Sequence, residues 1–268
     1  RIFNDRKKNL KSFSKTIILG SSPVDNYYRN MITFLPRIFF INEKEINLAL
    51  HRNSSNKWRA FISEIFGQLN IKIKKHIYLD DDFYRFTNSQ IPQFFSKKMS
   101  IKILNKSLLS QKNNNKLKVY VSRQNSNYRN LVNEEDIINK LKSMNFVIVD
   151  TNNMSIFDQI KIFSSAKKII SPTGSALTNI IFCKKGTKIV EIVPKYNFEY
   201  EKSFKNRYLE ICNLLNLNYE SIEADPIERS KLDINTEKFI SKKVLKESNY
   251  YKDLLVEKNK FENLINNY

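Results

Sequence analysis

Residues 166–194, AKKIISPTGSALTNIIFCKKGTKIVEIVP, hold two of the 4 glycines in this 268-residue chain and decide its predicted fold. Lys168–Ser171 is a β-branched run, typical of a buried parallel strand. Pro172-Thr173-Gly174 interrupts that run, Ser175–Phe182 suits a short helix, and Thr187–Val193 predicts the next strand. A strand that enters a helix through a tight turn directs backbone N–H groups and the helix dipole at one point. That point favours an anion such as phosphate.

The turn itself leaves two interpretations open. It lacks the G-x-G-x-x-G of dinucleotide-binding folds and the G-K-S/T of P-loops, and an ordinary βα turn explains its glycine as well as a phosphate site does. Arg123 and Arg129 follow the first strand of the same half, at the edge where open parallel sheets bind ligands. Each arginine alone is better explained as a solvated surface charge in so basic a chain. Both together with the glycine turn predict a phosphate site, because guanidinium groups match phosphate oxygens.

Composition sets the outer limits of the prediction. The chain is 41% hydrophobic with 19 Phe and 13 Tyr, which excludes wholesale disorder, and no apolar run approaches the roughly 20 residues of a membrane span. Cys183 and Cys212 cannot form a disulfide framework, so we expect buried reduced thiols in a cytoplasmic protein. The net charge of +19 suits nucleic acid, anionic lipid or phosphorylated substrates without choosing among them.

The first half of the chain has a mixed pattern that ends at a polar linker, Gln111–Lys116. We predict strands at Thr16–Gly20, Arg37–Ile41 and Ile71–Leu79, the last at a sheet edge, and helices at Asp25–Leu35, Asn42–Leu50 and Lys57–Phe66.

The second half alternates short strands and helices, which predicts a parallel sheet covered on both faces. The strands are Leu117–Val121, Phe146–Val149, Ile169–Ser171 and Ile189–Val193; the helices are Glu134–Met144 with Asn133 as its cap, Ile156–Ala166 and Lys205–Leu215. From about Glu228 the chain is charged and helical in pattern, without a strand signal. We therefore predict an α/β protein with domains at 1–110 and 117–225 and a helical tail at 226–268.

Two acidic features have competing explanations. Glu191 interrupts the strand KIVEIVP; exposed at the strand end it would accept hydrogen bonds from a ribose diol, and otherwise it pairs with Lys or Arg. Asp80-Asp81-Asp82 contains the D-x-D of metal–nucleotide clamps, although adjacent acids in a loop are usually only solvated.

Three segments together resemble glycosyltransferase family 61. They are SRQNSNYRNLVNEEDIINKLKSMNF at 122–146, the stretch 158–194, and NYYRNMITFLPRIFFI at 26–41. The second half matches in order and spacing through Arg129, Asn133, Glu134, Gln159, Gly174, Ala176, Leu177, Asn179, Phe182, Gly186, Glu191 and Pro194. The first half matches through Asn26, Tyr27, Tyr28, Leu35, Pro36 and Arg37.

The chain departs from the family pattern at three positions. Thr173 replaces the histidine of the glycine turn, Ser171 replaces its first glycine, and Arg29 replaces the histidine near the N-terminus. Thr173 can donate a hydrogen bond to phosphate and Arg29 can supply positive charge, but neither is a base at neutral pH. The departures leave open a homologue that binds sugar nucleotides without turnover.

The resemblance implies a GT-B-like fold of two Rossmann-like halves and an inverting, metal-independent glycosyltransferase. The donor would be a nucleotide sugar, UDP-linked, and the acceptor a surface glycan, such as a capsular one, or its lipid-linked precursor, with no other cofactor. Such a transfer needs positive charge on the departing diphosphate and a base for the acceptor hydroxyl. The candidate donor-binding residues are Arg123, Arg129, Thr173, Gly174, Ser175, Ala176, Asn179 and Glu191.

The candidate catalytic residues are Asp25, as the base, and Arg29. Asp25 has a simpler explanation as the N-cap of the helix that follows it. We expect a cytoplasmic enzyme, attached peripherally to an anionic membrane where lipid-linked acceptors reside. The alternative from another class is a basic nucleic-acid-binding module, which the charge and the aromatic content favour but no recognition motif supports.

Overall fold

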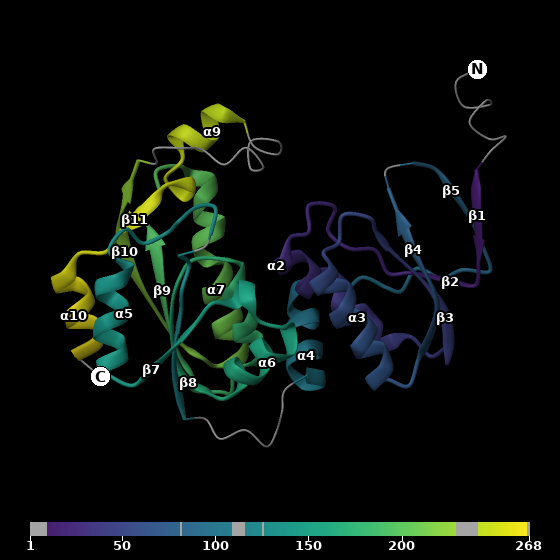
Figure 1. Cartoon of the computed structure of the whole chain (residues 1–268), viewed down its shortest axis with the longest axis horizontal. Coiled ribbons are helices and arrows are strands. Elements are labelled where there is room, and N and C mark those ends of the chain that lie inside the picture. The colour runs from purple at the N-terminus through teal and green to yellow at the C-terminus, as the bar shows by residue number, and fades with distance from the viewer. Residues whose placement is uncertain (1–9, 81, 109–115, 125, 229–240, 267–268) are drawn as a thin grey trace. The chain divides into compact units, whose positions relative to one another are not determined.

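The computed structural model (Figure 1) describes residues 10–80, 82–108, 116–124, 126–228 and 241–266. They form two compact units: unit 1 comprises Arg1–Ser107 and Ser155–Phe157, and unit 2 comprises Leu108–Met154 and Asp158–Tyr268. Residues 111–115 of the predicted linker lie outside the described residues. Each unit contains parallel strands and helices, which confirms the predicted α/β class.

Unit 2 is built on a six-stranded sheet in the order β11-β10-β9-β8-β6-β7. All neighbours pair in parallel except β10 and β11, which are antiparallel. The strands are β6 (Leu117–Val121), β7 (Phe146–Val149), β8 (Ala166–Pro172), β9 (Lys188–Pro194), β10 (Asn218–Ile227) and β11 (Asp253–Leu255). This order reverses direction between β6 and β8, which is where doubly wound sheets open a crevice for ligands.

Helices cover both faces of this sheet. Figure 1 shows α5 (Glu134–Ser143) and α10 (Lys258–Asn266) on one face, and α6 (Ile156–Ser164) and α7 (Lys202–Leu215) on the other. The predicted helix after the glycine turn is the 3-10 helix η4 (Ser175–Phe182). Shorter elements are η3 (Thr151–Asn153), η5 (Glu199–Glu201), α9 (Lys242–Glu247) and η6 (Asn249–Tyr251).

Unit 1 has a smaller parallel sheet in the order β2-β3-β4, so β4 lies at an edge, as predicted. Its strands are β2 (Thr16–Ile18), β3 (Glu45–His51) and β4 (Lys72–Leu79), and β1 (Lys11–Ser14) pairs in parallel with β5 (Tyr84–Thr87). The remaining elements are α2 (Tyr27–Arg29), the π-helix η1 (Asn30–Phe34), the 3-10 helix η2 (Leu35–Phe40), α3 (Asn56–Gln68) and α4 (Lys97–Leu108).

Two predictions for unit 1 are wrong. Arg37–Ile41 was predicted as a strand, but most of it belongs to η2, which has Pro36 near its start, where the fixed φ of proline suits a helix. Asn42–Leu50 was predicted as a helix, but Glu45–His51 forms β3, whose buried residues pair with strands on both sides. In both segments the tertiary packing overrides the local pattern.

The prediction of a helical tail without a strand is also incomplete. Helices α9 and α10 are present, but β11 lies between them and pairs with β10. Leu254, Val256, Phe261 and Ile265 are buried in the same cluster as strand residues of unit 2. This part of the chain therefore contributes to the core of unit 2, which a charged pattern could not indicate.

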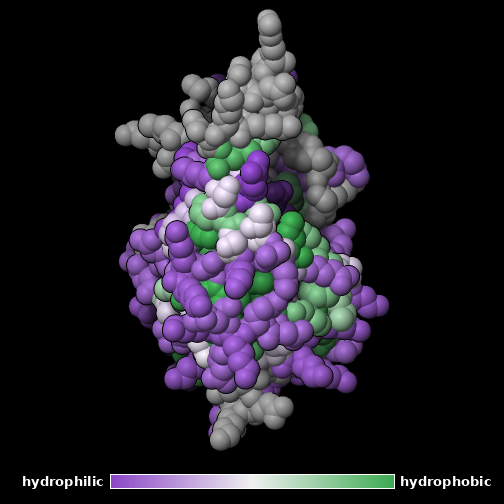
Figure 2. All heavy atoms as spheres, turned by 90° about the vertical axis from the view of Figure 1, so that its right-hand side faces the viewer, coloured by the Kyte–Doolittle hydropathy of each residue, from purple (hydrophilic) through white to green (hydrophobic). Residues whose placement is uncertain are grey.

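Several large apolar side chains of unit 1 remain exposed. Figure 2 views the side on which β1 and β3 lie, and it shows hydrophobic side chains between hydrophilic ones. Phe40, Ile91, Phe94 and Met99 come from η2 and the segment 91–99, and each is 45–66% exposed. No helix among the described residues is long and apolar enough to cross a membrane.

Candidate functional site

The candidate site lies where β6 and β8 end, at the point where the strand order of unit 2 reverses. The loop after β6 carries Arg123 and Arg129, and the turn after β8 carries Thr173 and Gly174. Because β6 and β8 are parallel neighbours, their carboxyl ends meet at one edge. The structure therefore brings the two arginines next to the glycine turn, although Arg129 and Thr173 are 44 positions apart in the sequence.

Arg123 lies directly against Gly174. A Cβ atom placed on Gly174 would be 1.9 Å from Nη1 of Arg123, so the guanidinium occupies the space of the missing side chain. Nη2 donates to the Tyr128 carbonyl at 2.8 Å, while Nε is buried without a partner among the described residues. Burial, and then the charge of Arg129, lower the pKa of Arg123 to about 10. An anion at this edge would accept a hydrogen bond from Nε and would stabilise the charged form of Arg123.

Glu134 fixes the backbone from which Arg123 projects. This buried carboxylate accepts hydrogen bonds from the Tyr120 hydroxyl at 2.8 Å and from the Arg123 backbone N–H at 3.0 Å. Asn133 precedes α5, but the predicted side-chain cap is absent. Its amide instead donates to the Val256 carbonyl at 2.8 Å and accepts from the Val256 N–H, so it ties α5 to the segment after β11.

Arg129 is only 3% exposed, and two of its guanidinium nitrogens donate to carbonyl groups of the protein. Nε donates to the Thr173 carbonyl at 2.9 Å and Nη1 to the Tyr250 carbonyl at 3.0 Å. Its guanidinium carbon lies 4.5 Å from the ring centre of Tyr128 and 4.0 Å from that of Tyr250. Burial alone would lower the pKa of Arg129, but the tyrosines raise it above its ordinary value. The arginine stays charged in a dry environment.

Hydrogen bonds from neighbouring elements hold the turn after β8. The Thr173 N–H donates to the Ile192 carbonyl at 2.8 Å, and the Tyr208 hydroxyl donates to the Gly174 carbonyl at 2.6 Å. Ser175, the first residue of η4, is exposed and Ala176 is partly buried. The exposed end of η4 thus adjoins the Arg123 guanidinium across Gly174.

Glu191 is fully buried in β9, so it does not have the exposed position that a contact with a ribose would need. Its Oε2 accepts a hydrogen bond from the Tyr219 hydroxyl at 2.7 Å. Burial raises the pKa of Glu191 to about 7, and this rise is opposed by the nearby Thr173 side chain, by the hydrogen bond from Tyr219 and by the charge of Arg129. Glu191 therefore lies inside the protein, on the strand next to β8, and not at the exposed edge of the site.

Asn179 also lies in the interior. It is fully buried in η4 and donates to the Gln159 Oε1 atom at 2.8 Å. Gln159 in turn donates to the Thr151 carbonyl at 3.0 Å, so the two amides join η4, α6 and the segment before α6. This geometry gives Asn179 a supporting place behind the glycine turn.

Asp25 and Arg29 belong to unit 1 and lie after β2. Asn26, and not Asp25, caps α2, because its side chain accepts from the Arg29 N–H at 3.0 Å. Asp25 has a left-handed φ of 47°, and its carboxylate accepts from the Asn30 amide at 3.0 Å. Arg29 is exposed. The N-cap explanation of Asp25 is therefore wrong.

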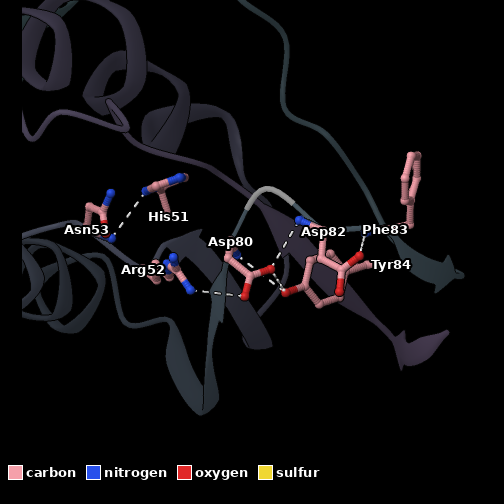
Figure 3. Close-up of polar contacts among 7 residues, drawn as sticks. All are labelled: His51, Arg52, Asn53, Asp80, Asp82, Phe83 and Tyr84. Atoms are coloured by element: carbon pink, nitrogen blue, oxygen red, sulfur yellow. Dashed lines mark hydrogen bonds and ion pairs between the residues drawn. The ribbon is translucent and has the colours of Figure 1, made fainter. Parts of the chain in front are cut away.

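The acidic run is tied up by local contacts, which Figure 3 shows. Asp80 forms an ion pair with Arg52 at 3.3 Å and accepts from the Tyr84 hydroxyl and from the Asp82 N–H. The hydrogen bond from Tyr84 lowers the pKa of Asp80. Asp81 lies outside the described residues, within which no group of three or more His, Cys, Asp or Glu could hold a metal ion.

The tyrosines around Arg129 are the site residues that the sequence analysis missed. Tyr128 adjoins Arg129 in the chain, but Tyr208 and Tyr250 come from distant segments. Only the high aromatic content hinted at them. The two cysteines, Cys183 and Cys212, are buried free thiols, as predicted.

The comparison with protein families supplies the remaining finding. A family model described as Glycosyltransferase 61 matches residues 27–190. The match spans α2, both arginines of the loop after β6 and the glycine turn. No curated protein is significantly similar to the chain.

Proposed function

Since the chain belongs to the glycosyltransferase 61 family, we propose that it is an inverting, metal-independent transferase with a nucleotide-sugar donor, UDP-linked. It is a glycosyltransferase, so a sugar nucleotide and a glycan acceptor are its general substrate classes. We propose a surface glycan, such as a capsular polysaccharide, or its lipid-linked precursor as the acceptor.

One observation carries the proposal for the donor: the Arg123 guanidinium lies over Gly174 with a buried, unpartnered Nε, beside the fixed charge of Arg129. The reaction leaves negative charge on the departing diphosphate, and prearranged cations at that place stabilise the transition state more than the ground state. Ser175 and Ala176 extend the same edge at the start of η4.

The acceptor half of the proposal rests on unit 1. In a GT-B-like arrangement of two parallel-sheet halves, Asp25 would take the proton of the acceptor hydroxyl, and Arg29 would add positive charge. The hydroxyl oxygen then attacks the anomeric carbon, and the bond from that carbon to the phosphate oxygen breaks. Its electron pair leaves with the diphosphate, and the sugar configuration inverts. The carboxylate of Asp25 accepts a hydrogen bond from the Asn30 side-chain amide, which orients it.

Calorimetric titration with UDP, GDP, CDP and CMP tests the donor site. We expect saturable heat with one of them, and Arg129→Ala should weaken it about tenfold, or about 1.4 kcal/mol. Arg52→Ala is the matched control, because Arg52 is an exposed arginine that pairs only with Asp80 among the contacts drawn in Figure 3. Absence of binding to all four nucleotides would contradict the proposal.

Turnover separates an enzyme from a homologue that only binds its donor. Donor hydrolysis and sugar transfer should fall by about 100-fold or more in Asp25→Asn, in line with the loss of a general base. Nucleotide affinity should stay unchanged, because Asp25 is outside unit 2. Equal turnover in wild type and Asp25→Asn would remove Asp25 as the base.

We also propose a cytoplasmic location with peripheral attachment to an anionic membrane. Phe40, Ile91, Phe94 and Met99 of unit 1 are exposed, as is Lys98, and exposed apolar side chains together with lysines suit the interface of such a membrane. Phe94→Ser with Lys98→Glu should abolish sedimentation with vesicles that contain phosphatidylserine. Equal sedimentation with neutral vesicles would contradict it.

A further inference from the structure

Tyr250 reaches the candidate donor site from far away in the chain. It is 121 residues from Arg129 and lies outside the segment that matches the family. Its carbonyl accepts from Nη1 of Arg129 at 3.0 Å, and its ring lies 4.0 Å from the guanidinium carbon. One residue therefore holds the arginine through both its backbone and its side chain.

The ring of Tyr250 is occupied on its other sides. It lies 4.5 Å from the Phe204 ring, 5.0 Å edge-to-face from Tyr251, and stacks at 6.5 Å on Tyr196. With Arg129 on one face and these rings around it, Tyr250 has little surface left for a nucleobase. Its position suits support of the arginine better than direct contact with a ligand.

The segment around Tyr250 is fixed at both ends. On one side, the Asn249 amide donates to the Lys195 carbonyl at 2.7 Å, and the Asn249 N–H donates to Asn197 at 3.0 Å. On the other, Asp253 accepts from the Asn130 N–H at 3.0 Å, next to Arg129 itself. The tyrosine is thus held against the loop after β6 by hydrogen bonds that do not involve its own side chain.

We infer that Tyr250 is a positioning residue that holds Arg129 in the orientation needed for the donor diphosphate. Tyr128 contacts a second side of the guanidinium, with its ring centre 4.5 Å from the guanidinium carbon. Arg129 has a left-handed φ of 61°, which a non-glycine residue adopts only when its surroundings hold it there. The inference rests on the proposed function, since it gives Arg129 a diphosphate to bind.

A double-mutant cycle tests this role, read as the affinity for UDP or whichever nucleotide the wild type binds. Tyr250→Phe keeps the ring and the carbonyl, so its affinity should stay within about twofold of wild type. Tyr250→Leu removes the ring and should weaken binding about fivefold. The variant Arg129→Ala/Tyr250→Leu should bind no worse than Arg129→Ala alone, because both changes remove one interaction.

Tyr78→Leu is the matched control. Tyr78 stacks on Arg59 at 3.9 Å in unit 1, so the change removes a similar arginine–ring contact away from unit 2 and should leave nucleotide affinity unchanged. If Tyr250→Leu does not fold, Tyr128→Leu removes the second ring beside Arg129 and carries the same expectation. Full affinity in Tyr250→Leu, or multiplied losses in the double variant, would overturn the inference.

A second readout separates this inference from the proposed function. The Nε–H of Arg129 should exchange slowly with solvent in nuclear magnetic resonance spectra of wild type and Tyr250→Phe, and quickly in Tyr250→Leu. A wild type that binds no nucleotide but shows this pattern would refute the donor site and retain the support of Arg129 by Tyr250. Slow exchange in Tyr250→Leu would refute the support itself.

Discussion

Arg37 in unit 1 and Arg123 in unit 2 both place guanidinium nitrogens inside the protein, but the two arginines differ in their partners. Arg37 in unit 1 is 1% exposed, and its three donor nitrogens contact the carbonyls of Pro92, Leu19 and Ile18. In unit 2, Arg123 has a buried Nε without a described partner, and its guanidinium lies in the space left by Gly174. Burial alone lowers the pKa of Arg37 to about 10, whereas Arg123 also feels the charge of Arg129.

The difference distinguishes a cation that completes the fold from one that we propose binds the donor. Buried polar groups are nearly always hydrogen-bonded, so an unpartnered donor next to a second cation supports the proposal that a diphosphate binds there. Arg37, by contrast, has a protein carbonyl as partner for each of its three guanidinium nitrogens. Four experiments test this contrast, from the largest expected effect to the smallest.

Arg37→Ala should cause the largest loss of stability. The change removes the Arg37 donors from three carbonyls and removes the contact of 3.8 Å with the Phe94 ring, so the free energy of unfolding should fall by about 4 kcal/mol. Urea denaturation followed by tryptophan fluorescence measures it, because Trp58 lies in unit 1. A loss under about 1 kcal/mol would mean that Arg37 does not stabilise the fold, contrary to its proposed contrast with Arg123.

Glu191→Gln should remove a pH dependence of stability worth about 3 kcal/mol. The folded pKa of about 7 lies above the ordinary 4.5, so the folded chain holds a proton that the unfolded chain releases between these values. The free energy of unfolding should therefore fall as the pH rises from 4.5 to 7, and then level off. Denaturation series at pH 5 and pH 8 test this, with the exposed Glu223→Gln on β10 as the control. An unchanged slope in Glu191→Gln would contradict it.

Gly174→Ala should weaken nucleotide binding about tenfold, or about 1.4 kcal/mol, because the new Cβ displaces the Arg123 guanidinium. The fold should persist, since Gly174 has an extended φ of 175° and the displaced group is the end of a flexible side chain. Gly67→Ala in α3 is the control: nothing lies within 4 Å, so it should gain about 0.5–1 kcal/mol of stability without changing affinity. Unchanged affinity in Gly174→Ala would mean that the Arg123 guanidinium does not contribute to nucleotide binding.

Divalent cations should have the smallest effect. The carboxylate of Asp80 is engaged by Arg52 and Tyr84, and the proposed transfer uses arginines where other enzymes use a metal. Nucleotide affinity measured with magnesium, with manganese and with a chelator should agree within about twofold. A loss of affinity in the chelator that Asp80→Asn reproduces would restore the D-x-D interpretation.

The sequence predicted unit 2 better than unit 1 for a physical reason. Strands buried on both faces are short hydrophobic runs between turns, so β6, β7, β8 and β9 were visible from Leu117–Val121 onward. In unit 1 the run RIFFI is as apolar as a strand, but η2 buries its arginine against distant carbonyls. A local pattern cannot reveal such distant partners.

The candidate site was predictable to a similar extent. The convergence of Arg123, Arg129 and Gly174 followed from one rule about the edges of parallel sheets. The burial of Glu191, the amide pair of Asn179 and the support of Arg129 by Tyr250 did not, because each depends on side chains from other elements. Position along a strand indicates which edge a residue occupies, but it does not indicate which neighbour fills the space above it.

The pairing of β11 with β10, and of Leu254 with the loop at Asn130, has a consequence for biosynthesis. Asn133 and Val256 are 123 positions apart, so a growing chain leaves the ribosome with its arginine loop finished long before its supports exist. Contacts between such distant positions form slowly and leave apolar surface uncovered in the meantime. We expect nascent chains halted before Tyr250 to be substrates for chaperones, and release of the segment through Ile265 to be the event that makes this half protease-resistant.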